Sequence, residues 1–587
     1  MPQASQECLR LRGLLATNSV MISVKVQCSC GQKYAFEVEP VNGRLPQPVN
    51  CPTCGADGTA AANEVIAQQL SRQTASPPPP RPTTAPPVDK RPKSKLAVCI
   101  LAGVGCIALI AAGAGVIWWK HNATAASVAQ TTPLVASQTK TAAPSAIPEQ
   151  YRYRHPKATL PPEVAAFVAA KEKQAHTLVQ KQGLKLDPAV QGYFDALKAG
   201  RIGESQQLHY DSRFNKESHP QLEGPLGQLL IDVVLTADAL GESQPDLFLA
   251  LGRAMTNSLS PGCIYFGGTD PGRGLPTLLC GAPGDPFFVV SQNVLCDGRY
   301  LELLRQQYGS RIRLPTTNEV AQCSESYCAD VLKRKEAGRL MPGEDVVLKD
   351  GKPQVQGQIA VMSLNALIAR QIFEKNGECD FYVEESYPLQ WMYPYLLPHG
   401  LLMKLNREPL ELIPAQEIQQ DRDFWSRQLA DKIGDWLTPD TPLSNICAFA
   451  ERVFGKKDFS GFTGDRRFIG DKYSVSAYSK LRSSIGGVYA WRLNPDSRTT
   501  APQYRPKTAA QSQELSDAAD FAFKQAFAIC PSSPEAVFRY AQLLLQQRRF
   551  EDALLVAETS LKVDSGNGQV RGLVENVRAY KKQSAGP

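Results

Sequence analysis

One apolar run constrains this chain more than any other feature. Residues 96–119 (LAVCILAGVGCIALIAAGAGVIWW) carry no charged side chain and lie between Lys95 and Lys120. A helix of this length is about 36 Å long, which is enough to cross a hydrocarbon core of about 30 Å. A signal peptide would begin near residue 1 and be shorter, and a core helix rarely extends this far without a polar side chain. The run therefore predicts one transmembrane helix.

Basic residues flank this run unequally and predict its orientation. Five of them precede it, and Lys120 is the single Lys or Arg of residues 120–134; the preceding ones are Arg81, Lys90, Arg91, Lys93 and Lys95. The positive-inside rule then predicts a bacterial inner-membrane protein with a cytoplasmic N-terminus and a periplasmic C-terminal part. Residues 63–95 are expected to form a Pro-rich basic linker and residues 120–150 a flexible one. Small residues at four-residue spacing inside the run would permit a homodimer.

Composition fits a multidomain globular chain. Hydrophobic residues make up 43% and charged residues 21%, and the formal net charge is +7. Part of the basic excess lies beside the membrane run, where it suits anionic lipid. Because no basic segment carries interleaved aromatic residues, no nucleic-acid partner is expected. Residues 1–20 show no structural pattern, so they are expected to be disordered or to precede a true start at Met21.

Two close pairs of cysteines predict a zinc ribbon over residues 21–62. Each pair is followed by a glycine that permits a tight knuckle turn, and the four thiolates can surround one structural Zn²⁺; they are Cys28, Cys30, Cys51 and Cys54. Four cysteines leave no open position for a catalytic water. The first pair is C-x-C, whereas ribbons usually have C-x-x-C. Disulfides, four unrelated thiols and a rubredoxin-like iron site are the alternatives, and a reducing cytoplasm disfavours disulfides.

Residues 151–475 alternate helical and short apolar segments after an N-terminal helical stretch. Strands are expected at 263–266, 287–293, 380–386 and 400–408, with helices between them and a helical turn over 388–396. This alternation predicts a mostly parallel sheet joined by right-handed crossovers. The predicted fold class is thus multidomain α/β: a zinc ribbon, one transmembrane helix, an exported α/β domain and C-terminal α-hairpins.

Polar residues gather after the expected strands, where ligands bind in parallel sheets. The candidate ligand-binding residues are Thr269, Asp270 and Arg273 after the first strand, Gln292, Asn293 and Asp297 after the second, Glu384 and Glu385 after the third, and Asn406 and Arg407 after the fourth. They could bind a sugar, a peptide or a carboxylated ligand, or they could cap helices and satisfy one another's hydrogen bonds. Glu384 and Glu385 are adjacent in an expected strand, so their side chains are predicted to point to opposite faces. No nucleophile elbow or metalloprotease helix is present, and no catalytic residue is assigned.

The C-terminal residues 476–583 resemble tetratricopeptide repeats. Ala519 and Ala553 recur at the period of about 34 residues that such repeats have, and Ala541 occupies the matching small position of a first helix. A polar insertion follows the helix expected at 479–492. Fewer than three repeats rarely stand alone, so the array is expected to dock on the α/β domain. An ordinary helical hairpin is the alternative.

Four long segments within residues 262–492 resemble a known family. They are 265–273 (YFGGTDPGR), 291–309 (SQNVLCDGRYLELLRQQYG), 380–409 (DFYVEESYPLQWMYPYLLPHGLLMKLNREP) and 479–492 (SKLRSSIGGVYAWR). The region resembles the soluble C-terminal part of bacterial protein O-mannosyltransferase-like membrane proteins of the GT-C type, which precedes tetratricopeptide repeats on the outer face of the membrane. The chain is most similar to bacterial proteins that combine the zinc ribbon, one span and this domain.

The resemblance implies a link to glycan transfer but not the transferase activity. The family's many-span module holds its acidic catalytic residue and the groove for a lipid-linked sugar, and this chain has no such module. We therefore expect a non-enzymatic, single-pass protein whose exported part binds a protein, peptide or glycan partner. The alternative is an accessory or divergent component of glycan transfer.

Overall fold

The computed structural model describes residues 22–27, 33–38, 49, 57–74, 157–214, 219–268, 271–280, 286–341, 344–349, 352–385, 388–496 and 499–584. The chain divides into two compact units, Met1–Gly103 and Val104–Pro587, which are described separately. The apolar run 96–119, the four paired cysteines and both candidate residues Thr269 and Asp270 lie outside the described residues.

The described residues of the first unit form an antiparallel hairpin and one helix. Strands β1 (Ile22–Gln27) and β2 (Lys33–Val38) pair from Ile22 opposite Val38 to Gln27 opposite Lys33, and helix α2 (Thr59–Thr74) packs on them. Val24 and Val26, two positions apart in β1, face the helix, and Ala62 and Ile66, one turn apart in α2, face the strand. These four residues form the buried core of the unit. This packing extends the helix into residues whose composition predicted a linker.

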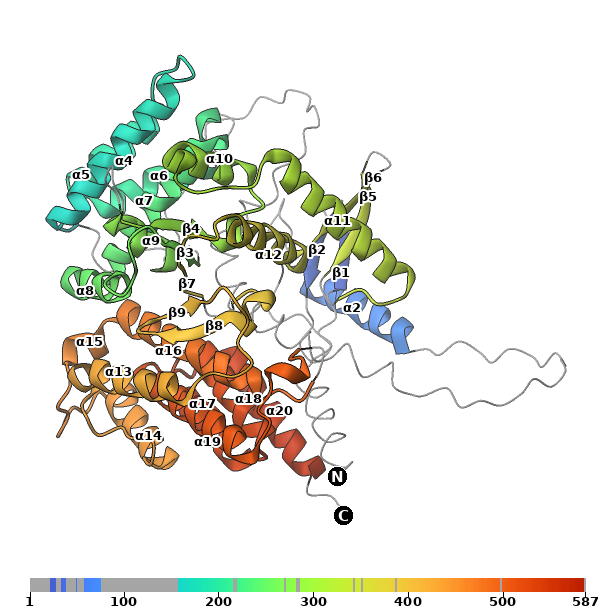
Figure 1. Cartoon of the computed structure of the whole chain (residues 1–587). Coiled ribbons are helices and arrows are strands. Elements are labelled where there is room, and N and C mark those ends of the chain that lie inside the picture. The colour runs from blue at the N-terminus through green and yellow to red at the C-terminus, as the bar shows by residue number, and fades with distance from the viewer. Residues whose placement is uncertain are drawn as a thin grey trace, which may run out of the picture. The chain divides into compact units, whose positions relative to one another are not determined.

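The described part of the second unit begins with five helices that form one side of it (Figure 1). Four of these helices have a proline in the first turn, where the missing N–H removes no hydrogen bond of the helix. The side chain of Asp187 caps the helix that starts at Pro188 by accepting from the N–H of Ala189. The helices are α4 (Pro162–Gln180), α5 (Pro188–Lys198), α6 (Ile202–Phe214), α7 (Pro225–Glu242) and α8 (Pro245–Thr256), with the 3₁₀ turn η3 (Pro220–Glu223) before α7. Apolar residues of α7 are buried along its length, so this helix is the centre of the layer.

A five-stranded mixed sheet lies at the centre of the second unit. Its spatial order is β4-β3-β7-β9-β8, and its strands are β3 (Ile264–Gly267), β4 (Phe288–Ser291), β7 (Phe381–Val383), β8 (Leu396–His399) and β9 (Leu402–Leu405). β3 is parallel to both β4 and β7, whereas β9 is antiparallel to β7 and to β8. All described side chains of β3, β4 and β7 are buried, as expected for strands covered on both faces.

Tyrosine side chains cover the outer edge of β4. The Tyr308 hydroxyl accepts from the Val289 N–H at 3.0 Å and donates to the Val289 carbonyl at 3.0 Å. The Tyr300 hydroxyl accepts from the Ser291 N–H at 2.7 Å. Both tyrosines belong to α10 (Gly298–Tyr308), so one helix satisfies the backbone groups that an edge strand leaves open. This edge is not available for pairing with another strand.

Helices and a small hairpin separate β3, β4 and β7 along the chain. α9 (Pro271–Leu279) joins β3 to β4, and η4 (Gln292–Val294), α10, η5 (Gly309–Arg311), α11 (Thr317–Glu336), the antiparallel pair β5 (Asp345–Lys349) and β6 (Lys352–Gln356), and α12 (Gln358–Lys375) lead from β4 to β7. A capping box fixes the start of α11, because Thr316 and Glu319 satisfy each other's backbone N–H groups. The 3₁₀ turn η6 (Gln390–Tyr395) precedes β8.

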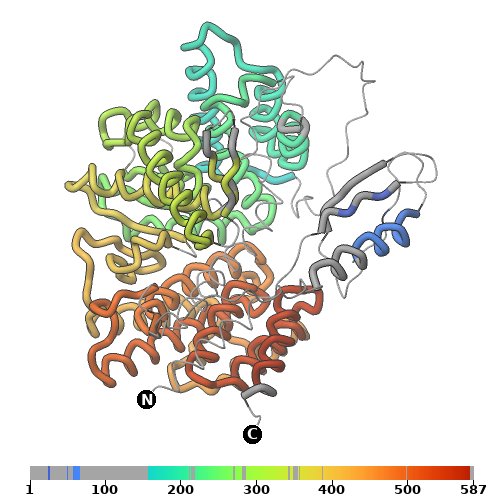
Figure 2. Tube along the Cα trace, turned by 90° about the vertical axis from the view of Figure 1, so that its right-hand side faces the viewer, coloured from blue at the N-terminus to red at the C-terminus, as the bar shows by residue number. Residues whose placement is uncertain are grey.

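The remaining chain is helical, and Figures 1 and 2 both show its last helices packed side by side. Its elements are α13 (Ala415–Ile433), α14 (Leu443–Ala450), the π-helical turn η7 (Glu451–Gly455), α15 (Arg466–Gly470), α16 (Lys472–Arg492), η8 (Pro502–Tyr504), α17 (Ala509–Ile529), α18 (Pro534–Gln546), α19 (Phe550–Val563) and α20 (Gly568–Ser584). α16 packs along α17 and also contacts α7, α8, β8 and β9. This helix therefore joins the C-terminal array to the sheet.

α16 and α17 approach each other closely at Gly486. A β-carbon there would lie 2.8 Å from the Phe523 ring, closer than real contacts allow. Asp421 of α13 ties the same region together, since it accepts from Arg482 at 2.8 and 2.9 Å and from the Tyr489 hydroxyl at 2.9 Å. A buried ion pair and a glycine contact thus fix α16 in place.

The fold class expected from the sequence is wrong. The described chain is predominantly helical, and its mixed sheet is small, with three parallel strands of at most four residues. The helical turn expected over 388–396 is confirmed as η6, whereas the antiparallel strand β8 that follows it was not expected. Within the described residues no helix is long and apolar enough to cross a membrane, so the expected transmembrane element of the fold is not found in that part of the chain.

Candidate ligand-binding site at the strand ends

The sheet places a topological switch point at the carboxyl end of β3. The chain leaves β3 to build β4 on one side and later returns to build β7 on the other, and all three strands run in the same direction. The segments that follow the three strands therefore meet at the carboxyl ends of the strands, where open sheets of this kind bind ligands. Gly268, Gln292 and Glu384 are the first residues beyond the three strands.

Glu384 is buried against the loop that follows β3. Its Oε2 accepts from the Gly268 N–H at 3.2 Å, and its side chain is 1% exposed. A β-carbon at Gly272 would lie 1.6 Å from the same oxygen, so only glycine allows the carboxylate to lie there. The Lys480 ammonium of α16 lies 3.0 Å from the other oxygen, Oε1. Glu384 thus ties the β3–α9 turn, β7 and α16 together.

Glu385 faces the same cluster as its neighbour. Its Oε2 accepts from the Asn293 amide at 2.9 Å, and its backbone carbonyl accepts from the Ser484 hydroxyl at 2.7 Å. The Lys480 ammonium lies 4.0 Å from its Oε1. A β-carbon at Gly268 would be 2.6 Å from Oε2 of Glu385 and 3.4 Å from Oε2 of Glu384, so these oxygens are at most 6.0 Å apart.

The prediction that the two glutamates point to opposite faces is therefore wrong. Side chains alternate along an extended strand, but β7 ends at Val383, and both glutamates lie beyond it. The backbone there is free to turn both carboxylates toward Lys480. The paired carboxylates share one site after all.

The environment of Glu385 changes the pKa of its carboxyl group. Burial raises the pKa of Glu385 above its ordinary value, and the charges of Glu384 and Glu535 add to this; Lys480 and the Asn293 amide act in the opposite direction without cancelling it. The hydroxyl of Tyr265 on β3 has a pKa well above its usual range because it is buried, with further contributions from both glutamates. Tyr265 is therefore close to the pair.

Several polar atoms at the carboxyl ends of the strands are buried without a hydrogen-bond partner. Gln292 is 0% exposed, and neither its Oε1 nor its Nε2 has one. The same holds for Oδ1 of Asn293 and for the Tyr265 hydroxyl. A buried polar group without a partner costs about 1–3 kcal/mol, so a protein rarely keeps several together unless something satisfies them. The carboxyl ends of the strands therefore offer hydrogen-bond donors and acceptors that have no partner within the described part of the protein.

Two other candidate residues belong to a buried structural network. Arg273 donates to Asp232 Oδ1 at 2.7 Å and to the Gln228 carbonyl at 2.9 Å, and its guanidinium lies 4.7 Å from the Tyr300 ring centre. Asp297 caps α10 by accepting from the Arg299 N–H, and it also accepts from Gln228 at 2.9 Å. Both side chains connect helices and leave no group directed to the glutamate pair.

Asn406 and Arg407 lie at the opposite end of the strands from the glutamate pair. β9 is antiparallel to β7, and Leu405 at its end pairs with Phe381 at the start of β7. Asn406 donates to the Tyr395 carbonyl, and Arg407 donates to the carbonyls of Phe373, Asn376 and Cys379. The sequence suggested a fourth parallel strand, and its true direction removes both residues from the candidate site.

Sequence reasoning missed Lys480, Ser484 and Tyr265. Lys480 and Ser484 are four residues apart and so lie on one face of α16, which is the face that meets the glutamates. One signal was present: the segment 479–492 was among the four that carry the family resemblance. The other segments contain Tyr265 and Gly268, Gln292 and Asn293, and Glu384 and Glu385. The structure brings described residues of all four segments together at this cluster.

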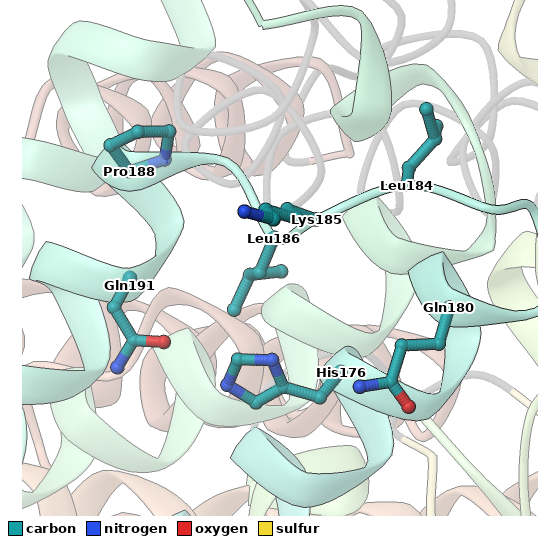
Figure 3. Close-up of a pocket in the computed structure, with 7 residues that line it drawn as sticks. All are labelled: His176, Gln180, Leu184, Lys185, Leu186, Pro188 and Gln191. Carbon is teal, nitrogen blue, oxygen red and sulfur yellow. The ribbon is translucent and has the colours of Figure 1, made fainter.

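A separate pocket of about 450 Å³ lies between α4 and α5 (Figure 3). The segment that joins the two helices contributes Leu184, Lys185 and Leu186, with His176, Gln180, Pro188 and Gln191 completing the lining. Leu184 is 47% exposed, so the pocket is open, and none of these lining residues has a buried polar atom without a partner. The chemistry therefore favours the strand ends over this pocket.

Within the described residues no group of three or more His, Cys, Asp or Glu side chains could hold a metal ion. The four cysteines predicted to bind zinc lie outside them. Comparisons with protein-family models, with curated proteins and with solved structures find no match to this chain.

Proposed function

We propose that the second unit is a binding domain and that the strand-end cluster of Tyr265, Gln292, Asn293, Glu385 and Lys480 is its site. The observation that carries this proposal is Gln292, a fully buried amide with no partner for either polar atom. A bound ligand would satisfy the amide and so offset the free energy that its burial costs in the free protein.

The chemistry of the cluster favours a carbohydrate among the ligands that such a site could take. The amides offer donors and acceptors side by side, the carboxyl groups accept, and the phenol can do either. Each hydroxyl group of a sugar is likewise both a donor and an acceptor. Lys480 opposes an approaching cation, and the two glutamates oppose an anion, so an uncharged polar ligand fits best.

Extended peptides fit this sheet less well. Peptides that add a strand need an open sheet edge. Tyr300 and Tyr308 occupy the backbone groups of the β4 edge, and α13 and α16 pack against β8 at the other edge. A ligand held by side chains at the strand ends does not need either edge.

Calorimetric titration of the full-length chain with maltotriose, mannotriose and chitotriose tests the proposal. We expect at least one trisaccharide to bind the wild-type chain and to lose about tenfold or more in affinity with Gln292→Met, which keeps the side-chain length but removes both polar atoms. Asn406→Ala, at the opposite end of the strands, is the matched control and should bind normally. Failure of all three sugars, with a tripeptide panel binding instead, would reject the carbohydrate assignment.

A role as a component of glycan transfer is the second candidate, and one observation favours it. The four segments that resemble the transferase-like proteins supply the residues that meet at the cluster. If this role is correct, a glycosyltransferase should co-purify with the full-length chain. Its absence from repeated purifications would leave the binding role alone.

A further inference from the structure

One face of α16 contacts the glutamate pair and continues toward the C-terminal helices. Lys480, Ser484 and Gly487 follow one another at spacings of four and three residues, so they share this face. The Lys480 ammonium lies 3.0 Å from the Glu384 carboxylate. The Ser484 hydroxyl donates to the Glu385 carbonyl at 2.7 Å. Gly487 is therefore the next residue of the helix face that holds the glutamates.

Arg539 of α18 lies over this face. α18 packs against α16, and a β-carbon at Gly487 would lie 2.5 Å from Nη1 of Arg539 and 3.2 Å from its Cζ. The same nitrogen donates to the Ser483 carbonyl at 2.8 Å, and Arg539 is only 7% exposed. Glycine leaves room for the guanidinium at this point because it has no side chain. An arginine of the C-terminal helices is thus fixed against the turn of α16 that carries Ser484.

The same face of α18 is turned toward the glutamate pair. Burial raises the pKa of the Tyr393 hydroxyl; the charge of Arg539 lowers this pKa, and the charge of Glu385 raises it further. Glu535, one turn before Arg539 on α18, contributes to the raised pKa of Glu385. Tyr393 also stacks on Trp491 of α16, with the ring centres 5.4 Å apart. The ends of the sheet strands, α16 and α18 therefore meet around one group of side chains.

We propose that the C-terminal helices complete the strand-end site and that Arg539 is a positioning residue in it. Through the Ser483 carbonyl, its guanidinium fixes the turn of α16 that presents Lys480 and Ser484 to the glutamates. This inference rests on the proposed binding function and adds that the sheet and the helical array form the site jointly. When this turn is loosened, the ligand has to order it on binding and so binds more weakly.

Two adjacent glycines provide a matched test. Gly487→Ala places a methyl group against the end of a flexible arginine side chain, which must move by about 1 Å but can do so without disturbing the helix packing. Gly486→Ala places the same group 2.8 Å from the Phe523 ring and disturbs the packing of α16 on α17 instead. In calorimetric titration of the full-length chain with the same three trisaccharides, Gly487→Ala should bind about tenfold more weakly, because it displaces a charged hydrogen-bond donor. Gly486→Ala should bind normally at a temperature at which it is folded.

Arg539→Gln and Arg549→Gln form a second matched pair. Both remove a guanidinium from the helical array, but Arg549 forms its ion pairs with Asp520 and Asp552 inside the array. Arg539→Gln should lower trisaccharide affinity by about tenfold and, without any ligand, speed hydrogen exchange in the turn of α16 around Ser484. Arg549→Gln should change neither the affinity nor the exchange of that turn.

The outcomes separate this inference from the binding function. Unchanged trisaccharide affinity in both Gly487→Ala and Arg539→Gln, each verified as folded by thermal melting, would overturn the role of Arg539 and leave the binding function standing. Failure of the wild-type chain to bind any sugar would reject the binding function. Faster exchange around Ser484 in Arg539→Gln would in that case still support the link between α18 and α16, and unchanged exchange would overturn it.

Discussion

Replacement of Asp232 by Asn is the sharpest test of how the second unit is held together. Asp232 of α7 lies between two cations, with Lys171 Nζ at 2.9 Å and Arg273 Nε at 2.7 Å. The three side chains are 6%, 3% and 2% exposed, so water screens neither pair. Asn has the same shape as Asp but cannot neutralise either cation.

Breaking one buried pair by removing a partner costs about 3–5 kcal/mol, because the remaining charge stays buried. Asp232→Asn strands two cations, which places the expected loss near the upper end, about 4–5 kcal/mol. Urea unfolding followed by tryptophan fluorescence measures this loss, and hydrogen exchange in α4, α7 and α9 locates it. Asp246→Asn is the matched control: its pair with Arg467 is more than half exposed and should contribute less than about 1 kcal/mol.

The buried ion pairs of Asp232 also predict how the stability of the protein changes with pH. Burial alone would raise the pKa of Asp232, but the charges and hydrogen bonds of Lys171 and Arg273 lower it below its ordinary value. The stabilisation is therefore complete above the unfolded pKa, about 4, and is lost as the pH falls through the lower folded pKa. A loss below 1 kcal/mol in Asp232→Asn, with acid stability like that of the wild type, would refute this account of the helical layer.

Three further predictions concern other parts of the chain. Tyr308→Phe leaves a backbone N–H and C=O of the edge strand β4 without their partner, so urea unfolding should show a loss of about 1–3 kcal/mol. Gly272→Ala forces a methyl group onto the Glu384 carboxylate, so it should lower the free energy of unfolding by about 1–3 kcal/mol and also abolish trisaccharide binding. Gly298→Ala is the control: its methyl group meets no neighbour, so it should change neither the stability nor the binding. Metal analysis should find one zinc ion per chain that Cys28→Ser removes, if the predicted ribbon forms; a full zinc content in that variant would contradict it.

The sequence predicts the positions of the strands better than their directions. The apolar run at 263–266 overlaps β3 and the run at 287–293 contains β4, and the polar residues that follow both runs mark the correct end of the sheet. The direction of β9 is set by its tight connection to β8 at Gly400, where φ is 61°. β8 carries Pro398, which an outer strand tolerates, and this strand was not expected from the sequence.

The composition of the site depends on long-range packing that local patterns do not encode. Lys480 reaches the glutamates from a helix far along the chain, and the sequence around it indicates only a helix. Arg273 appeared to be a ligand-binding residue, but the partner that buries it, Asp232, comes from a helix with no polar motif. Residue type and strand position thus predict where a site forms, and tertiary contacts decide which residues belong to it.

The stability of the Gln292→Met variant tests the central claim most directly. If the strand ends are a binding site, the unpartnered amide destabilises the free protein. Its replacement should then raise the free energy of unfolding by about 1–3 kcal/mol while it weakens ligand binding by about tenfold or more. Gln228→Met is the matched control and should destabilise the protein, because that buried amide donates to Asp297 and accepts from Arg273. A Gln292→Met chain that is less stable than the wild type would show that the amide serves the fold, and it would contradict the proposed site.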